Sequence, residues 1–323
     1  MKKSKIKQIS ILILALLLVS CKNNTISENE ENSDKLQGTI SISGAFALYP
    51  MTVRWAEEFK KLHPDVRIDI SAGGAGKGMT DALSEMVDLG MFSREVCEEE
   101  VEKGAWKIAL TKDAVLPTIN SKNPFLKDLK RKGMSRQEFI DVYITEKIKN
   151  WGELVGNNDK KINNYTRSDA CGAAGTWGKY LGGDQESLIG IGVFGDPGMA
   201  DAIKKDILGV GYNNVVYIYD INSKIKYEGL EVIPIDINEN DTIDEEENVY
   251  NTLNDITIAI KDGKYPSPPA RDLYFVSQGK PEKEIVIEFI KWILTEGQKY
   301  VKESGYVQLS EEKIKSELDK ICN

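Results

Sequence analysis

The segment Arg167–Leu181 carries the residue types best suited to chemistry in this sequence. Arg167 and, two residues later, Asp169 precede the run of small residues Cys171-Gly-Ala-Ala-Gly. Small residues at the start of a helix leave backbone N–H groups unpaired and accessible, and such groups attract anions. A guanidinium can hold two oxygens of one tetrahedral anion, and a nearby acid fixes its orientation. The segment therefore predicts an oxyanion site.

A second glycine-rich segment, Gly73–Gly78, follows a predicted strand at Val66–Ser71 and could add N–H groups to such a site. It is not the phosphate loop of a nucleotide-binding protein. Ser71 stands where the first glycine of that motif belongs, and Gly78 stands where Ser or Thr must follow the lysine. Taken by itself, the segment fits a tight strand-to-helix turn equally well.

Helical and strand patterns alternate around these two segments. A βαβαβ start predicts a largely parallel sheet with ligand loops at the carboxyl ends of its strands. The chain after residue 36 is longer than one compact core usually holds, so two lobes are predicted. The predicted strands cover residues 39–43, 66–71, 87–92 and 114–119, and the predicted helices cover residues 50–62, 78–86, 134–144, 198–205 and 281–295.

The amino-terminal residues 1–21 have the pattern of a lipoprotein signal peptide. Lysines precede an apolar run at residues 11–19, which is too short to span a bilayer comfortably. Leu18-Val-Ser-Cys21 resembles a bacterial lipobox, in which Cys21 is lipidated and becomes the mature N-terminus. An uncleaved anchor helix is the alternative. Residues 22–36 lack apolar mass and are predicted to form a flexible tether.

The overall charge limits the classes of partner. A net charge of −9 disfavours nucleic acid and anionic lipid surfaces. The same charge repels small anions, so an anion site must use local backbone dipoles and one or two buried cations. The sequence therefore predicts a small, enclosed site rather than a basic surface.

Histidine and cysteine are scarce. The single histidine, His63, lies at the end of a predicted helix, so no Ser-His-Asp triad or histidine metal cluster is expected. Besides Cys21 the cysteines are Cys97, Cys171 and Cys322, whose spacing fits no zinc motif. A Cys97–Cys322 disulfide is compatible with an exported protein, and the sequence leaves it open.

Together, these segments resemble the phosphate-binding proteins of bacterial ABC phosphate importers. The matches follow the order of that family along most of the chain after the tether. No single segment is specific to that family, but the whole set of segments is. The matching segments are Ser41–Pro50, Trp55–Phe59, Gly73–Gly78, Val87–Gly90 with Ser93 and Arg94, Lys147–Leu154, Arg167–Leu181, Gly209–Tyr212 and Tyr265–Val276.

The resemblance implies an α/β fold of the periplasmic-binding-protein-like type II class. Two lobes, each a mixed, mainly parallel sheet flanked by helices, are joined by a two-strand hinge and close over the ligand. Residues 37–116 and 275–323 would form the first lobe, and residues 117–274 the second.

The resemblance also implies roles for individual residues. Arg167 matches the arginine that binds phosphate, and Asp169 matches the acid that orients it. Asp88 matches an aspartate that accepts a proton from the ligand, which would favour protonated phosphate over sulfate. Tyr49 matches an aromatic residue whose backbone N–H donates to the anion. The expected phosphate-binding set is Leu48, Tyr49, Gly74, Ala75, Asp88, Arg167, Asp169, Cys171, Gly172 and Ala173.

Several positions depart from the family pattern. Cys171 and Ala173 replace a serine and a threonine, Ala75 replaces a serine, and Leu48 replaces a threonine. The hydroxyl donors are lost, and a thiol donates only weakly. Each lost donor to a charged ligand costs about 1.5–3 kcal/mol. We therefore expect the phosphate to be bound mostly by backbone N–H groups and by one arginine side chain.

The expected protein is a non-enzymatic, monomeric solute-binding lipoprotein. It captures inorganic phosphate, requires no cofactor, binds no nucleic acid and delivers its ligand to an ABC permease. Its lipid anchors it to the cell membrane, facing the periplasm or the cell exterior. One alternative is a binding protein for sulfate, molybdate or tungstate. Others are a phosphoester hydrolase that uses Cys171, and a scaffold or signalling lipoprotein.

The acidic segment Asp236–Glu247 has the spacing of an EF-hand Ca²⁺ loop. Asp241 stands at the position where glycine is normal, although aspartate tolerates left-handed backbone better than most residues. The alternative is a solvated acidic loop. The expected ligands of a structural Ca²⁺ are Asp236, Asn238, Asn240, Thr242 through its carbonyl, Asp244 and Glu247.

Overall fold

The computed structural model describes residues 35–156 and 160–322, and residues 37–323 form one compact unit. The predicted signal peptide (residues 1–21), the lipid on Cys21 and residues 22–34 of the tether lie outside the described residues. Where the chain is described, no helix has the length and apolar character needed to cross a membrane.

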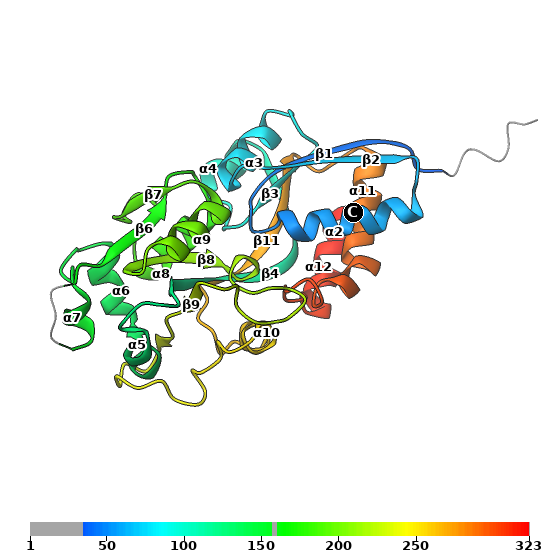
Figure 1. The fold of residues 1–323 in the computed structure, drawn as a ribbon. Helices are drawn as coiled ribbons and strands as arrows, with labels where there is room; N and C mark the ends of the chain where they lie inside the picture. Colours follow the sequence, from blue (N-terminus) through cyan, green and yellow to red (C-terminus); the bar gives the residue numbers. More distant parts are fainter. Residues whose placement is uncertain (1–34, 157–159, 323) are drawn as a thin grey trace, which may run out of the picture. The chain divides into compact units, whose positions relative to one another are not determined.

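The first lobe is built on parallel strands that continue into two antiparallel ones (Figure 1). Its strands are β1 (Gly38–Gly44), β2 (Val66–Ala72), β3 (Leu89–Phe92), β11 (Ala270–Gln278) and the first part of β4 (Ala105–Asn120). Its helices are α2 (Tyr49–Leu62), α3 (Ala75–Leu83), α4 (Glu98–Glu102), α11 (Glu284–Leu294), η2 (Glu296–Tyr300) and α12 (Glu311–Cys322).

An aromatic face holds α2 against the carboxyl-terminal helices. Pro50 fits the first turn of α2, where its missing N–H costs nothing. Phe59 packs edge-on against Phe289 of α11 with ring centroids 5.0 Å apart. Trp55, fully buried, donates its indole N–H to the carbonyl of Gly297 at 2.9 Å. The amphipathic spacing of α2 therefore creates one layer of the first lobe.

The second lobe extends the same sheet. Beyond β4 the strand order is β8 (Gly209–Asn214), β6 (Asn163–Arg167) and β7 (Ile191–Val193), while β9 (Leu230–Val232) also pairs with β4. The short strands β5 (Met134–Ser135) and β10 (Ile235–Asp236) form a separate pair. Its helices are α5 (Leu126–Lys132), α6 (Arg136–Tyr143), α7 (Trp151–Leu154), α8 (Gly172–Leu181), α9 (Gly195–Lys205), η1 (Val215–Tyr217) and α10 (Leu253–Lys261).

The side chain of Trp177 on α8 organises the core of the second lobe. Trp177 is fully buried. Its ring stacks on Tyr212 of β8 with centroids 6.0 Å apart and meets Phe139 of α6 edge-on at 5.1 Å. These contacts tie α8 to both the sheet and a neighbouring helix, so the start of α8 has a defined position.

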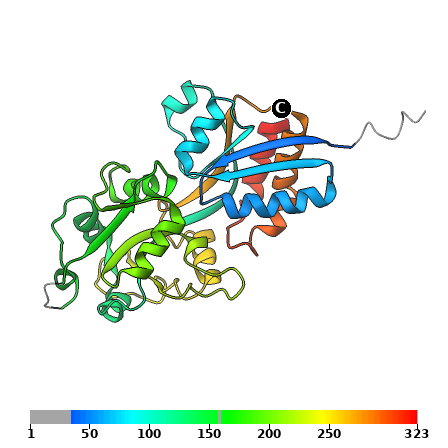
Figure 2. The ribbon, with the colours of Figure 1, turned by 45° about the horizontal axis from the view of Figure 1, so that its top comes forward.

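Two strands connect the lobes. β4 pairs with β11 through Ala114 and then, from Val115 onward, with β8. In Figure 2 the β1–β3 group and the β6–β8 group lie on either side of these long strands. The fold is therefore two α/β lobes joined by β4 and β11, as predicted. The lobe boundaries at residues 116/117 and 274/275 stay a prediction.

A buried ion pair lies where the two connecting strands meet. Arg271 on β11 donates from Nε to Asp113 Oδ1 on β4 at 2.9 Å, and the two side chains are 6% and 1% exposed. Arg271 Nη1 also donates to Thr176 Oγ1 on α8 at 2.9 Å. Burial raises the pKa of the Asp113 carboxyl, although the charge of Arg271 opposes that shift. Each of the two charges is therefore stable in the protein interior only because the other is present.

We expect Arg271→Ala to lower the free energy of unfolding by about 3–5 kcal/mol, because it leaves the Asp113 carboxylate buried and unpaired. Urea denaturation measures the change. Asp272→Asn on the same strand is the control, since Asp272 contacts Lys112 and Lys313 only at 3.9 Å and 3.7 Å. If Arg271→Ala and Asp272→Asn lower the free energy of unfolding equally, the stabilising role of the Arg271–Asp113 pair is contradicted.

Candidate functional site

The amino ends of α3 and α8 approach each other. Gly74, which precedes α3, has φ +92°, and a Cβ there would lie 3.0 Å from both the Ala170 carbonyl and Asp169 Oδ2. The N–H of Gly76 donates to the same Ala170 carbonyl at 3.0 Å. The structure thus brings Gly74 and Gly76, on either side of Ala75, from the first lobe against the segment that precedes α8 in the second.

A second close approach joins the start of α8 to the end of β3. A Cβ on Gly172 would lie 2.2 Å from both the carbonyl oxygen and Oγ of Ser93, so only glycine permits this contact. Gly172 and Ala173 are the first residues of α8, and their N–H groups have no acceptor within the helix. The third, Ala174, donates to Cys171 Sγ at 3.4 Å. Backbone donors therefore gather at this end of α8.

The guanidinium of Arg167 lies beside these donors. Its Nε and Nη2 donate to the two carboxylate oxygens of Asp169 at 2.8 and 2.6 Å. The orienting role of Asp169 stays a prediction. Nη1 donates to Asp196 Oδ2 at 2.8 Å. Burial alone lowers the pKa of Arg167, but the charges of Asp196 and Asp169 together raise it. A guanidinium has five N–H donors, and these bonds use one on each nitrogen.

Phe46 covers the arginine from the other lobe. It lies in the turn between β1 and α2, and its ring centroid is 5.8 Å from Arg167 Cζ. The ring also meets Phe194 edge-on with centroids 6.0 Å apart. The carbonyl of Phe46 accepts a hydrogen bond from the hydroxyl of Tyr217 at 3.0 Å. Aromatic groups thus shield the guanidinium from water.

Leu48 and Tyr49 lie in the same turn as Phe46. The N–H of Leu48 donates to the Ala45 carbonyl at 3.2 Å. The N–H of Tyr49 donates to the carbonyls of Ala45 at 3.2 Å and Phe46 at 3.3 Å. Both N–H groups are therefore already hydrogen-bonded within the turn. The N–H of Tyr49 can donate to an anion, as predicted, only if its bonds within the turn break.

Cys171 is buried at the N-cap of α8. Its N–H donates to Gln185 Oε1 at 3.0 Å. Burial raises the pKa of its thiol to about 12, even though Arg167 acts in the opposite direction. The sulfur therefore stays protonated at neutral pH and serves as a weak cap rather than as a nucleophile.

Asp88 does not join the other predicted residues, and its assignment is corrected. β1 and β3 are parallel, with Gly44 opposite Met91, so Asp88 precedes β3 at the end of the sheet opposite from Ser93. Asp88 Oδ2 accepts from the N–H and hydroxyl of Ser41 at 2.7 and 2.8 Å, and Lys283 Nζ lies 3.3 Å from Oδ1. The carboxylate supports the edge of the first lobe.

The side-chain oxygens of the acidic segment 236–247 accept hydrogen bonds from groups of the same loop. Asp236 accepts from the N–H of Asp241 at 2.8 Å, and Glu247 Oε1 accepts from the N–H of Ile237 at 2.8 Å. Asp244 Oδ2 accepts from the side-chain amides of Asn238 and Asn240, and Asn240 Oδ1 accepts from the N–H of Thr242. In the described parts of the chain, no group of three or more His, Cys, Asp or Glu is placed to hold a metal. The Ca²⁺ prediction is therefore unsupported.

The exposed cysteines also stay separate. Cys97 and Cys322 are free thiols, so the structure contains no Cys97–Cys322 disulfide.

Comparison with known proteins identifies the family. Residues 29–296 match the model of the PBP superfamily domain. The chain belongs to the PBP superfamily. The phosphate-binding protein PstS of Bacillus subtilis is 30% identical over 231 residues, which cover 68% of this chain and 73% of that relative.

Solved structures of the superfamily share the fold. A Clostridium perfringens protein, assigned by its description to phosphate ABC transporter substrate-binding proteins and solved with bound phosphate, gives a TM-score of 0.69 at 23% identity. The match covers 84% of this chain and 100% of that one. An ABC-type phosphate transport receptor from Vibrio cholerae gives 0.61 at 19% identity, with the same coverage.

Two residues of the site were not predicted from the sequence. Phe46 stands between Ala45 and Ala47, and its bulk was the only signal in the sequence. Asp196 lies in the first turn of α9, a place where acids are common for reasons of helix stability alone. Only the fold shows that Asp196 reaches Arg167.

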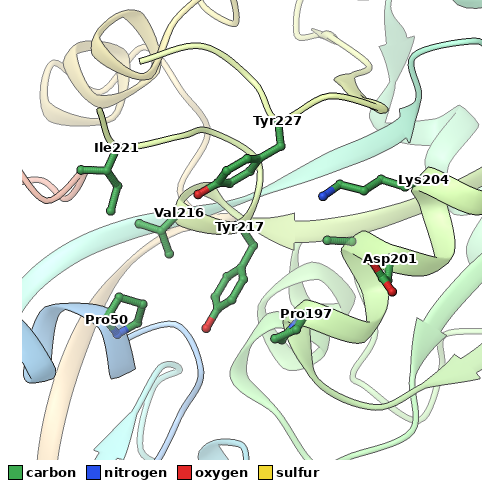
Figure 3. A pocket seen from close by; sticks show the side chains of 9 residues that line it. Pro50, Pro197, Asp201, Lys204, Val216, Tyr217, Ile221 and Tyr227 are labelled. Atoms are coloured by element: carbon green, nitrogen blue, oxygen red, sulfur yellow. The ribbon is translucent and has the colours of Figure 1, made fainter. Parts of the chain in front are cut away.

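A hollow of about 430 Å³ is lined by none of the predicted phosphate-binding residues. In Figure 3, Tyr217 projects between Pro50 of the first lobe and Pro197 of the second. Tyr217, which lines the hollow, also donates its hydroxyl to the Phe46 carbonyl, so the hollow adjoins the turn that covers Arg167. Its lining is mostly apolar and aromatic, unlike that of an anion site.

We expect Gly172→Ala to weaken oxyanion binding at least tenfold, because its Cβ would collide with the Ser93 backbone and hold α8 away. Calorimetric titration measures the affinity. Gly175→Ala one turn later is the control, since its Cβ would meet only the flexible Arg94 side chain at 3.3 Å. Equal affinities for the two variants would contradict the close approach at Ser93.

Proposed function

We propose that this protein captures inorganic phosphate between its two lobes and delivers it to the permease of an ABC importer. The observation that carries the proposal is the meeting of the α3 and α8 amino ends beside the buried Arg167. Backbone N–H groups and one guanidinium are the donors that suit a tetrahedral oxyanion. The phosphate-binding relative from Bacillus subtilis supports phosphate as that anion.

The arrangement also explains why two lobes are useful. Gly74 and Ala75 belong to the first lobe, while Arg167, Gly172 and Ala173 belong to the second. A ligand that contacts both sets of residues binds the closed state more tightly than the open one. It therefore shifts the equilibrium toward the closed state. Release to a permease then requires only that the lobes separate, because the ligand is held non-covalently.

Location and attachment extend this proposal. The lysine-rich start, the short apolar run and the lipobox-like Leu18-Val-Ser-Cys21 support a lipid on Cys21 that holds a monomer at the outer face of the cell membrane. The tether of residues 22–36 would let the binding unit reach its permease. No cofactor or metal is part of the proposal.

Calorimetry on the protein without residues 1–36 tests the function, with phosphate, arsenate, sulfate and molybdate as ligands. We expect phosphate to bind, and Arg167→Gln to weaken it by about tenfold to a hundredfold, since a charged donor is removed. Arg67→Gln is the control, because Arg67 is exposed on β2 and pairs only with Asp69. If the unaltered protein binds no phosphate, the proposal fails.

The hydrolase alternative depends on Cys171. Because burial raises the pKa of that thiol to about 12, we expect no phosphomonoester hydrolysis by the protein. We also expect Cys171→Ser to change phosphate affinity by less than about fivefold, since a hydroxyl can replace the weak sulfur cap. A release assay with a chromogenic phosphate ester makes the test. Turnover that disappears in Cys171→Ser would establish the enzyme instead.

A further inference from the structure

One side chain of the first lobe, that of Phe46, packs into the second lobe beside Arg167. Its ring meets the ring of Phe194 edge-on, at an interplanar angle of 87° and with centroids 6.0 Å apart. Arg167 Cζ lies 5.8 Å from the centroid of the same ring. Both separations fall within the range in which aromatic pairs and cation–π pairs attract each other. Phe46 therefore joins the first lobe to two side chains of the second.

The backbone at the start of α9 lets this ring approach closely. Gly195, the first residue of α9, has φ +72°, a conformation that favours glycine. A Cβ there would lie 3.2 Å from Phe46 Cζ and 3.3 Å from Phe46 Cε2, which is closer than side chains normally pack. The ring therefore lies directly against the backbone of the second lobe, and a larger residue at position 195 would push it away.

The backbone that Phe46 contacts also holds the arginine in place. The N–H of Gly195 donates to Asp169 Oδ1 at 3.0 Å, and Asp196 Oδ2 accepts from Arg167 Nη1 at 2.8 Å. Phe46 thus packs both on the guanidinium and on the segment that fixes it. Because Phe46 belongs to the turn that precedes α2 in the first lobe, these contacts exist only while the two lobes are together.

A hydrogen bond to the same turn adds to this connection. The hydroxyl of Tyr217, on η1 of the second lobe, donates to the Phe46 carbonyl at 3.0 Å. Burial raises the pKa of that hydroxyl, so it stays protonated and remains a donor at neutral pH. The side chain and the main chain of Phe46 therefore both bind the second lobe.

Phe194 keeps much of its surface in water, although it takes part in this contact. The residue stands at the N-cap of α9 and is 61% exposed. Removing its ring leaves no cavity in the protein core, so the change costs little folding free energy. Its edge-on contact is with a residue of the other lobe. The contribution of Phe194 is therefore to closure rather than to folding.

We propose that Phe46 and Phe194 form an aromatic latch that keeps the two lobes together over the anion and sets the rate at which phosphate is released. The inference rests on the proposed function and adds a control of ligand release to it. The latch contacts exist in the closed state, so they slow its opening. They are absent while the lobes are apart, so they do not affect the first encounter with phosphate.

Exchange of bound radiolabelled phosphate against an excess of unlabelled phosphate, followed by rapid mixing on the purified full chain, measures the release rate. We expect Phe194→Ala to raise this rate about twofold to tenfold, since the edge-on contact is lost. Calorimetry should show an affinity lowered by the same factor, so that the association rate calculated from the two values is unchanged. Ile191→Ala is the control and should match the unaltered protein, because Ile191 is 52% exposed on the neighbouring strand β7.

A second variant separates the latch from the shielding of the arginine. Phe46→Ala removes both the contact with Phe194 and the ring over Arg167, so it should raise the release rate at least as much as Phe194→Ala does. In the double variant, Phe194→Ala should add nothing to the effect of Phe46→Ala, because their shared contact is already gone.

Several results would overturn the latch. An unchanged release rate in Phe194→Ala contradicts it, and so does a loss of affinity caused by slower association. A double variant in which the two effects multiply shows that the rings act independently, which also contradicts it. Should the Phe46 variants fail to fold, Phe194→Ala and its control decide alone. If the unaltered protein holds no radiolabelled phosphate, the proposed function itself is wrong.

Discussion

The buried pairing of Arg167 with two carboxylates is the interaction on which the proposed site depends. An ionised side chain inside a protein is tolerated only when it is paired and hydrogen-bonded. Here the pairing does not stop at the arginine, because it continues through an amide to the ion pair between the two connecting strands. The continuous series is Asp169, Arg167, Asp196, Asn214, Arg271 and Asp113.

This series joins the proposed anion site and the connection between the lobes in one electrostatic system. Asp113 and Arg271 lie on β4 and β11, while Arg167 and Asp196 lie at the ends of elements in the second lobe. Removing Arg167 leaves two carboxylates without their partner, and removing Arg271 leaves Asp113 without its own. An acidic protein can thus keep a charged guanidinium in its interior, because buried carboxylates pair with it.

The sequence predicted some of the elements and some of the site, for identifiable reasons, but it predicted only residues 114–119 of β4, which spans Ala105–Asn120. The helix at Tyr49–Leu62 and the strand at Gly38–Gly44 follow directly from apolar spacing. Arg167 and Asp169 are two residues apart, so local geometry alone brings them together. Asp196 is distant in sequence, and its contact with Arg167 depends on how β6 and α9 pack.

Two assignments show the limits of local pattern. Asp88 matched a family motif by position, but the register of β1 and β3 places it at the far end of the strands. The segment 236–247 has oxygen atoms at the right spacing for Ca²⁺. Spacing cannot reveal that backbone N–H groups and side-chain amides take up those oxygens. The Ca²⁺ prediction stays without support in the described residues.

A crystal structure of the protein grown with arsenate, measured at the absorption edge of arsenic, tests the location of the anion most directly. Arsenate has the shape and ionisation of phosphate and scatters anomalously. The predicted result is one arsenic peak between the amino ends of α3 and α8, within hydrogen-bond reach of Arg167. A peak elsewhere on the protein, with none beside Arg167, would contradict the assignment of the site.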